Sequence, residues 1–218
     1  MRIHKAGFSV ITTVILLFSF IMAIFVYTAS IAIIYISGFI FLTLLIFIFR
    51  FFRFPNRTIQ FNQNQVISPA DGTIVVIEEV EETDFIKEKR IQISIFMSVW
   101  NVHINWFPVI GTVIQSLHFN GRFMAARLPK SSHENERSVV VIETKNAGKV
   151  MVKQIAGAVA RRIITYTKPE QTIKAGDQLG FIRFGSRVDV LLPVDSKIHV
   201  KLNQKVTGGL TLLADLPQ

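Results

Sequence analysis

The chain has 218 residues, which suits one folded domain of ordinary size, and none of them is cysteine. The lack of cysteine excludes disulfides, thiolate metal sites and a thiol nucleophile. The formal net charge is +9, although half of the residues are hydrophobic, so the position of the charges decides which partners they indicate.

The first fifty residues are almost uniformly apolar. No Asp, Glu, Lys, Arg or His lies between Ala6 and Phe49. One straight helix over this stretch would be about 66 Å long at 1.5 Å per residue, roughly twice the hydrocarbon thickness of a bilayer. Two transmembrane helices fit better, at about residues 8–26 and 31–49, so residues 1–53 are expected to form a membrane anchor. A cleaved signal peptide is the alternative, but its apolar core would be only about 7 to 15 residues long.

Basic residues flank both predicted spans. They are Arg2, Lys5, Arg50, Arg53 and Arg57. By the positive-inside rule both ends of the helix pair face the cytoplasm, so the rest of the chain is expected on the cytoplasmic side of the bacterial inner membrane, with anionic lipid near these arginines. The remaining 19 basic and 15 acidic residues leave only +4. Without a compact basic stripe and stacking aromatics, nucleic-acid binding is not expected.

Residues 54–218 have a different pattern, in which short runs rich in Val and Ile alternate with Gly, Asn, Asp and Pro. This pattern predicts a mainly β catalytic domain, a compact sandwich or barrel. Only Arg122–Leu128 and Gln154–Arg162 are candidates for short helical turns, and the charged residues between Glu78 and Arg90 are expected to form a solvated loop. The expected strands are Thr73–Val80, Arg90–Met97, Gly111–Phe119, Ser138–Thr144, Lys149–Ile155, Gln178–Phe184 and Arg187–Leu192.

The pair Gly185-Ser186 is the strongest chemical signal in the chain. A serine hydroxyl directly after glycine can attack the preceding carbonyl, because glycine has no side chain to block the approach and tolerates the distorted backbone that the attack requires. Gly-Ser pairs are also common at turns and strand ends, so the pair alone does not establish this chemistry.

Several other motifs accompany this pair in a fixed order. They are Ser68-Pro69-Ala70-Asp71-Gly72, the segment Ile95–Asn105 with its single histidine, Asn135-Glu136-Arg137, the segment Gln154–Arg162, and the run Gly180–Val190. Together they closely resemble the short, membrane-anchored bacterial form of phosphatidylserine decarboxylase. The resemblance extends from about residue 68 to residue 190.

The resemblance implies a self-processing enzyme. The chain would cut itself between Gly185 and Ser186 into a β chain of residues 1–185 and an α chain of residues 186–218 that stay associated. Ser186 would become a covalent pyruvoyl group, which forms a Schiff base with phosphatidylserine and allows its decarboxylation to phosphatidylethanolamine. No metal is expected, and a homo-oligomer is left open.

His103 is the expected base, because imidazole can accept and return a proton near neutral pH. Asp71 is expected to orient it, as a buried carboxylate does in a serine-histidine-aspartate triad. Longer members of the family commonly carry a second histidine three residues on, where this chain has Trp106. His103 would then act in both processing and turnover, or another group would contribute.

Guanidinium groups suit the phosphate and the carboxylate of such a substrate. The candidates are Arg137, Arg161, Arg162, Arg183 and Arg187. Two other functions remain open at this stage. One is a membrane-tethered β module without catalysis, and the other is a pyruvoyl decarboxylase that acts on a different serine phospholipid or on a soluble amino acid.

Overall fold

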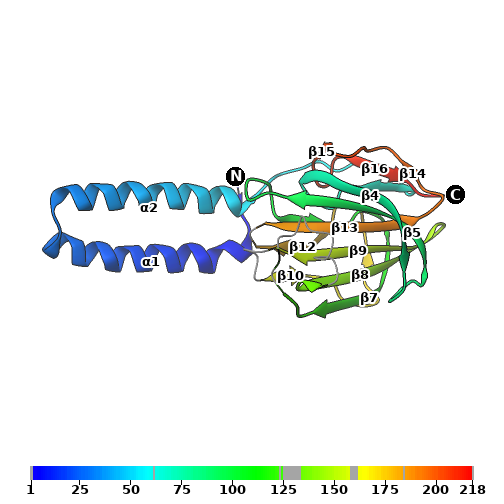
Figure 1. The fold of residues 1–218 in the computed structure, drawn as a ribbon, viewed down its shortest axis with the longest axis horizontal. Coiled ribbons are helices and arrows are strands. Elements are labelled where there is room, and N and C mark those ends of the chain that lie inside the picture. The colour runs from blue at the N-terminus through cyan, green and yellow to red at the C-terminus, as the bar shows by residue number, and fades with distance from the viewer. Residues whose placement is uncertain are drawn as a thin grey trace. The chain divides into compact units, whose positions relative to one another are not determined.

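A computed structural model describes residues 2–60, 62–122, 124, 134–157, 162–183 and 185–217. The chain divides into two compact units, Met1–Asn56 and Arg57–Gln218, which are considered separately. The first unit is helical and the second consists of β-sheets (Figure 1).

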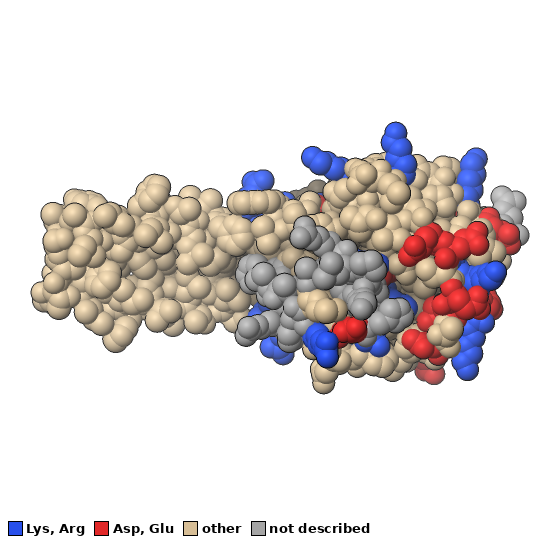
Figure 2. All heavy atoms as spheres, viewed as in Figure 1, with Lys and Arg blue, Asp and Glu red and all other residues tan. Residues whose placement is uncertain are grey.

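The helical unit contains α1 (Lys5–Thr28) and α2 (Ile31–Phe51), together with the short paired strands β1 (Arg2–Ile3) and β2 (Arg53–Phe54). His4 caps α1, because its Nδ1 atom accepts a hydrogen bond from the backbone N–H of Ala6 at 3.2 Å. Both helices are long and apolar enough to cross a bilayer, with mean hydropathies of 2.6 and 2.8. Figure 2 shows the absence of charge along most of their length.

These helices confirm the two predicted helical segments, and they are consistent with membrane anchoring. α1 extends beyond the expected range of 8–26 at both ends, because His4 supplies a cap outside the apolar run. The two helices pack together within this unit, where the rings of Phe18 and Phe41 stack.

Among the residues described, the β unit contains three sheets. An eight-stranded antiparallel sheet has the order β11-β7-β8-β9-β13-β5-β4-β15, and two three-stranded sheets have the orders β10-β12-β6 and β14-β16-β3. The strands are β3 (Gln65–Ile67), β4 (Gly72–Glu82), β5 (Glu88–Met97), β6 (Ile104–Trp106), β7 (Gly111–Phe119), β8 (Arg137–Thr144), β9 (Gly148–Ala156), β10 (Ile163–Thr165), β11 (Thr172–Ile173), β12 (Gln178–Ile182), β13 (Ser186–Pro193), β14 (Lys197–Ile198), β15 (Lys205–Val206) and β16 (Leu212–Asp215).

All seven predicted strands are confirmed, with ends that shift by two residues or fewer. The strands that the sequence did not reveal in this unit are only two to four residues long, too short for a period-two pattern to stand out. The helical turn expected at Gln154 is wrong for the part that the structure describes, since β9 continues to Ala156. The other candidate turn lies mostly outside the described residues.

The charged segment between Glu78 and Arg90 is also not the solvated loop that was expected. It forms the ends of β4 and β5 and the turn between them, and both Glu82 and Arg90 are buried. The Glu82 carboxylate accepts hydrogen bonds from the backbone N–H groups of Phe85 and Ile86, while Arg90 donates to the carbonyl of Lys149. The buried Glu82 carboxylate therefore stabilises the turn through these hydrogen bonds.

The central strand β13 presents two different faces. Val188, Val190 and Leu192 belong to the large apolar core, whereas Leu191 belongs to a smaller cluster on the opposite side of the sheet. Since successive side chains of a strand point to opposite faces, Ser186 shares the face of the main core and Arg187 does not.

Candidate active site

Ser186 is the first residue of β13 and is fully buried. β13 lies between β5 and β9, so Ser186 is opposite Met97 on one side and Ala156 on the other. Its hydroxyl donates to the sulfur of Met97 at 3.3 Å. The serine is therefore held on a rigid element in the middle of the sheet and is shielded from water.

Gly185 precedes it in a left-handed backbone conformation, with a φ of 65°. A Cβ atom built at this position would meet no other atom within 4 Å, so the backbone angle, and not lack of space, favours glycine here. The N–H group of Gly185 donates to Nε2 of His103 at 3.2 Å.

His103 thus lies beside the predicted scissile segment. It is fully buried, and its Nδ1 atom is 3.1 Å from the backbone carbonyl oxygen of Asn101. Because Nε2 accepts from Gly185, the ring proton belongs on Nδ1, where it can be donated to that carbonyl. The Asn101 side chain in turn accepts hydrogen bonds from the N–H and hydroxyl of Ser98, which fixes the turn before the histidine.

Asp71 lies in a different cluster from the one expected. Its carboxylate accepts two hydrogen bonds from Arg57, at 2.7 and 2.8 Å, and one from the N–H group of Gly208 at 2.8 Å. The structure therefore does not pair Asp71 with His103, whose orienting contact is the neutral carbonyl of Asn101. Arg57 is correspondingly not an exposed membrane flank, since only 10% of its side chain is accessible.

Trp106 completes this second cluster. The Arg57 guanidinium lies 4.6 Å from the centroid of its ring, which is the geometry of a cation–π contact. Gly208 allows the ring to approach closely, because a Cβ there would lie 2.4 Å from it. Trp106 is thus a packing partner of Arg57.

The four candidate arginines that the structure describes lie in different surroundings. Arg187 forms a buried ion pair with Asp189 at 2.5 Å and donates to the Ser94 hydroxyl at 2.8 Å, on the face of β13 opposite to Ser186. Arg137 stacks on the ring of Phe119. Burial raises the pKa of Tyr166, and the positive charge of Arg183 partly offsets this rise. Arg183 is therefore close enough to act on the Tyr166 phenol.

Arg162 lines an open hollow of about 340 Å³ with Ser116 and His118, and Arg161 lies outside the described residues. Arg187 points away from Ser186, because the two residues lie on opposite faces of β13. The four described arginines do not form a single anion-binding cluster.

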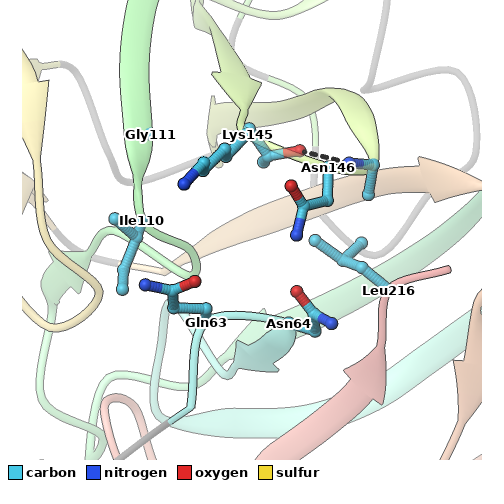
Figure 3. Close-up of a pocket in the computed structure, with 9 residues that line it drawn as sticks. Gln63, Asn64, Ile110, Gly111, Lys145, Asn146 and Leu216 are labelled. Atoms are coloured by element: carbon cyan, nitrogen blue, oxygen red, sulfur yellow. Dashed lines mark hydrogen bonds between the residues drawn. The ribbon is translucent and has the colours of Figure 1, made fainter. Parts of the chain in front are cut away.

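The pocket in Figure 3 does not belong to this site. It is a cavity of about 100 Å³ with amide and aliphatic walls, and none of the predicted site residues lines it. Its walls include Gln63, Asn64, Ile110, Gly111, Lys145, Asn146 and Leu216. Within the described part of the chain, no three His, Asp or Glu side chains gather as ligands of a metal would.

Met97, which the Ser186 hydroxyl contacts, and two polar residues linked to it through hydrogen bonds were not predicted as site residues. Met97, Asn105 and Gln154 are all buried and belong to β5, β6 and β9. An isolated Asn or Gln in an apolar strand gives no motif, and only the assembly of two sheets brings these side chains together. Their own hydrogen bonds are described below.

Comparisons with known proteins identify the family of the chain. A family model described as phosphatidylserine decarboxylase matches residues 44–214. The chain is 49% identical over 218 residues to a protein of Parabacteroides distasonis, with 99% of each chain covered. It is 44% identical over 221 residues to one of Porphyromonas gingivalis, with both covered completely, and 47% identical to one of Cytophaga hutchinsonii, with 99% of each covered.

Each of these relatives is named phosphatidylserine decarboxylase proenzyme. A β domain whose Gly-Ser pair has a buried serine, together with matches of this extent, defines an enzyme of the decarboxylase class. The chain belongs to the phosphatidylserine decarboxylase family.

Proposed function

We propose that this enzyme converts phosphatidylserine to phosphatidylethanolamine and carbon dioxide, with a pyruvoyl group that the chain makes from its own Ser186. The observation that carries the proposal is the arrangement around one peptide bond. Ser186 is buried on one side of it, while the N–H of Gly185 on the other side donates to Nε2 of His103. The names and extent of the relatives support the substrate.

Self-cleavage would begin with attack of the Ser186 oxygen on the carbonyl carbon of Gly185. His103 takes the hydroxyl proton and returns it to the departing amide nitrogen, so the peptide bond becomes an ester. Removal of the α-proton of Ser186 then expels the Gly185 carboxylate and leaves dehydroalanine. Water releases ammonia from this residue and leaves the pyruvoyl group.

The surroundings of Ser186 suit such a group. Residue 186 is buried at the start of a central strand, so a carbonyl there would be protected from bulk water and held by β5 and β9. The pyruvoyl group would supply an electron-withdrawing carbonyl that accepts the electron pair left by carbon dioxide. The imidazole of His103, which accepts a hydrogen bond from the N–H group of Gly185, is the group proposed to move protons at this position.

The two cleavage products would stay associated through the same sheet. β13 is paired with β5 and β9 along nearly its whole length, and β16, which follows it in the chain, is paired with β3. Since β13 and β16 would both belong to the α chain, each continues to be held by strands of the β chain after the cut.

The two apolar helices support a location of the enzyme in a membrane. We propose that α1 and α2 span the bacterial inner membrane with the β domain in the cytoplasm and with Arg50 and Arg53 near anionic lipid. Protease added outside intact spheroplasts should then spare the β domain. Digestion of that domain from outside would reverse the orientation.

The function is tested with Ser186→Ala in the full chain, because alanine has neither the nucleophile nor the leaving group. The wild type should run as two fragments on a denaturing gel and release carbon dioxide from vesicles that contain phosphatidylserine. Ser186→Ala should run as one chain and release none. Ser196→Ala removes another buried serine and should cleave normally. Cleavage of Ser186→Ala, or activity of an uncut wild type, would contradict the proposal.

A further inference from the structure

A chain of buried polar side chains leads from the sheet interior to the serine. The hydroxyls of Ser138 and Thr165 donate to Oε1 of Gln154 at 2.7 and 2.9 Å. Nε2 of Gln154 donates to Oδ1 of Asn105 at 2.7 Å. Gln154 and Asn105 are both fully buried, so these hydrogen bonds form away from water.

This chain sets the orientation of the Asn105 amide. Two hydroxyl donors occupy Oε1 of Gln154, so its nitrogen faces Asn105 and takes the oxygen of that residue. Nδ2 of Asn105 is therefore turned the other way, toward the sulfur of Met97 at 3.6 Å.

The sheets are shaped to allow the approach. Gly180 of β12 leaves room for Gln154, since a Cβ there would lie 2.7 Å from its Nε2 atom. β12 also pairs with β6, which carries Asn105. A glycine in one strand thus lets the glutamine of another sheet reach the asparagine.

Two donors meet at one weak acceptor. The Met97 sulfur receives both the Ser186 hydroxyl, at 3.3 Å, and the Asn105 amide. A thioether sulfur is a poor acceptor, so the amide N–H is only partly satisfied. The Ser186 oxygen, for its part, accepts no hydrogen bond from the described residues, although it has the capacity to do so.

Self-cleavage would change this balance. When Ser186 gives up its proton, its oxygen becomes negatively charged and a far stronger acceptor than sulfur. Because the Asn105 amide and the Ser186 hydroxyl both contact the Met97 sulfur, a hydrogen-bond donor is already present in the surroundings of that oxygen before it ionises.

We propose that Asn105 is the hydrogen-bond donor to the Ser186 oxygen during self-cleavage, and that Gln154 is the residue that positions it. The inference rests on the proposed function of Ser186. The hydroxyl proton goes to His103, the oxygen electron pair forms the bond to the Gly185 carbonyl carbon, and Asn105 keeps its proton throughout. Asn105 then shifts its N–H from the Met97 sulfur to the serine oxygen.

The test measures the rate of self-cleavage of the full chain in cell-free synthesis with lipid vesicles, by denaturing gel. Asn105→Asp keeps the size and the oxygen that Gln154 contacts but lacks the donor when ionised. It should cleave roughly 10-fold more slowly at pH 8, the effect of losing one hydrogen bond to an ionised acceptor. Asn146→Asp adds the same charge on an exposed turn and should leave the rate unchanged.

The pH profile separates donation from a merely structural role. A protonated carboxyl group is again a donor, so Asn105→Asp should regain rate relative to the wild type as the pH falls. Gln154→Glu should lose less, since it loosens the asparagine without removing it. The thermal unfolding of Asn105→Asp in the Ser186→Ala background shows whether the variant folds.

The outcomes are distinguishable. A wild type that does not cleave would overturn the proposed function itself. A wild type that cleaves beside a folded Asn105→Asp of equal rate, or one slowed equally at every pH, would overturn the role of Asn105 alone. If Asn105→Asp does not fold, a wild-type rate and pH profile for Gln154→Glu would overturn the inference.

Discussion

The two faces of β13 do different work within eight residues of one strand. On one face, Ser186 meets Met97 and is followed by the apolar core residues Val188 and Val190. On the other face, Arg187 and Asp189 form a buried ion pair. The difference teaches that adjacency in sequence is a poor guide to a shared role, because a strand sends neighbouring side chains in opposite directions. In the proposed function the serine face carries the chemistry, and the ion pair on the arginine face is expected to stabilise the strand.

The largest effect should come from His103, which contacts Gly185 just before the serine face begins. His103→Ala removes the base beside Gly185 and should slow self-cleavage at least about 100-fold, as is typical for the loss of a general base. The measurement is a pulse-chase on a denaturing gel. His199→Ala, which removes a partly exposed imidazole paired with Asp215, is the control. Equal rates for wild type and His103→Ala would remove this histidine from the mechanism.

The arginine face should respond in stability. Arg187→Met removes the guanidinium that is paired with the buried Asp189 carboxylate, which should lower the free energy of unfolding by about 3–5 kcal/mol. Replacing both as Arg187→Met with Asp189→Leu should recover much of this. Arg122→Met breaks an exposed pair with Glu134 and should cost less than about 1 kcal/mol. The measurement is chemical unfolding in detergent.

A normal stability for Arg187→Met, accompanied by a raised KM for phosphatidylserine, would contradict this division between the faces. It would indicate that Arg187 binds the substrate.

Asp71 extends the comparison to a second cluster. Asp71→Asn and Arg57→Gln each break the same two-pronged pair, so they should change stability and cleavage rate alike. In unfolding experiments the double variant should show a coupling of about 1–3 kcal/mol. Strong loss of cleavage in Asp71→Asn, with none in Arg57→Gln, would show that Asp71 acts on the catalytic histidine after all.

The smallest effect concerns Glu82, near the arginine face. Burial alone would raise its pKa, but hydrogen bonds from the N–H groups of Ile86 and Phe85 and the charge of Lys153 together lower it. A lowered folded pKa gives stability that is present above the ordinary value of 4.5 and is lost as the pH falls through the folded value.

Glu82→Gln should therefore unfold more easily than the wild type at pH 7, by roughly 1 kcal/mol, and the gap should narrow below pH 4.5. Thermal unfolding across this range measures it, with the exposed Glu79→Gln as the control. A gap that stayed constant with pH would mean that the charge of Glu82 does not stabilise the turn.

Much of the fold could be predicted because its signals are local. The apolar run of α1 and α2 and the period-two pattern of long strands such as β7 depend on neighbouring residues alone. Short strands such as β6 acquire their structure from pairing with distant segments. The burial of Glu82 could not be predicted either, since charge runs are usually solvated and the hydrogen bonds that hold this one exist only in the folded turn.

The site divides in the same way. Gly185, Ser186 and His103 stood out through motifs, and the structure brings them together. The partners of Asp71 could not be predicted, because Arg57 lies in what the sequence presents as a membrane flank and Gly208 lies far along the chain. Asn105 ends a segment that the resemblance includes, but nothing local marks its side chain, and its hydrogen bonds depend on the meeting of two sheets.

The central claim is that Ser186 becomes a pyruvoyl group, and the mass of the small fragment tests it most directly. The full chain, purified in detergent, should yield a fragment of residues 187–218 preceded by pyruvoyl, lighter than the same fragment with serine by the mass of ammonia. It should also be blocked to Edman degradation. An active enzyme whose small fragment begins with a free Ser186 would contradict the account, because ordinary hydrolysis would then have cut the chain.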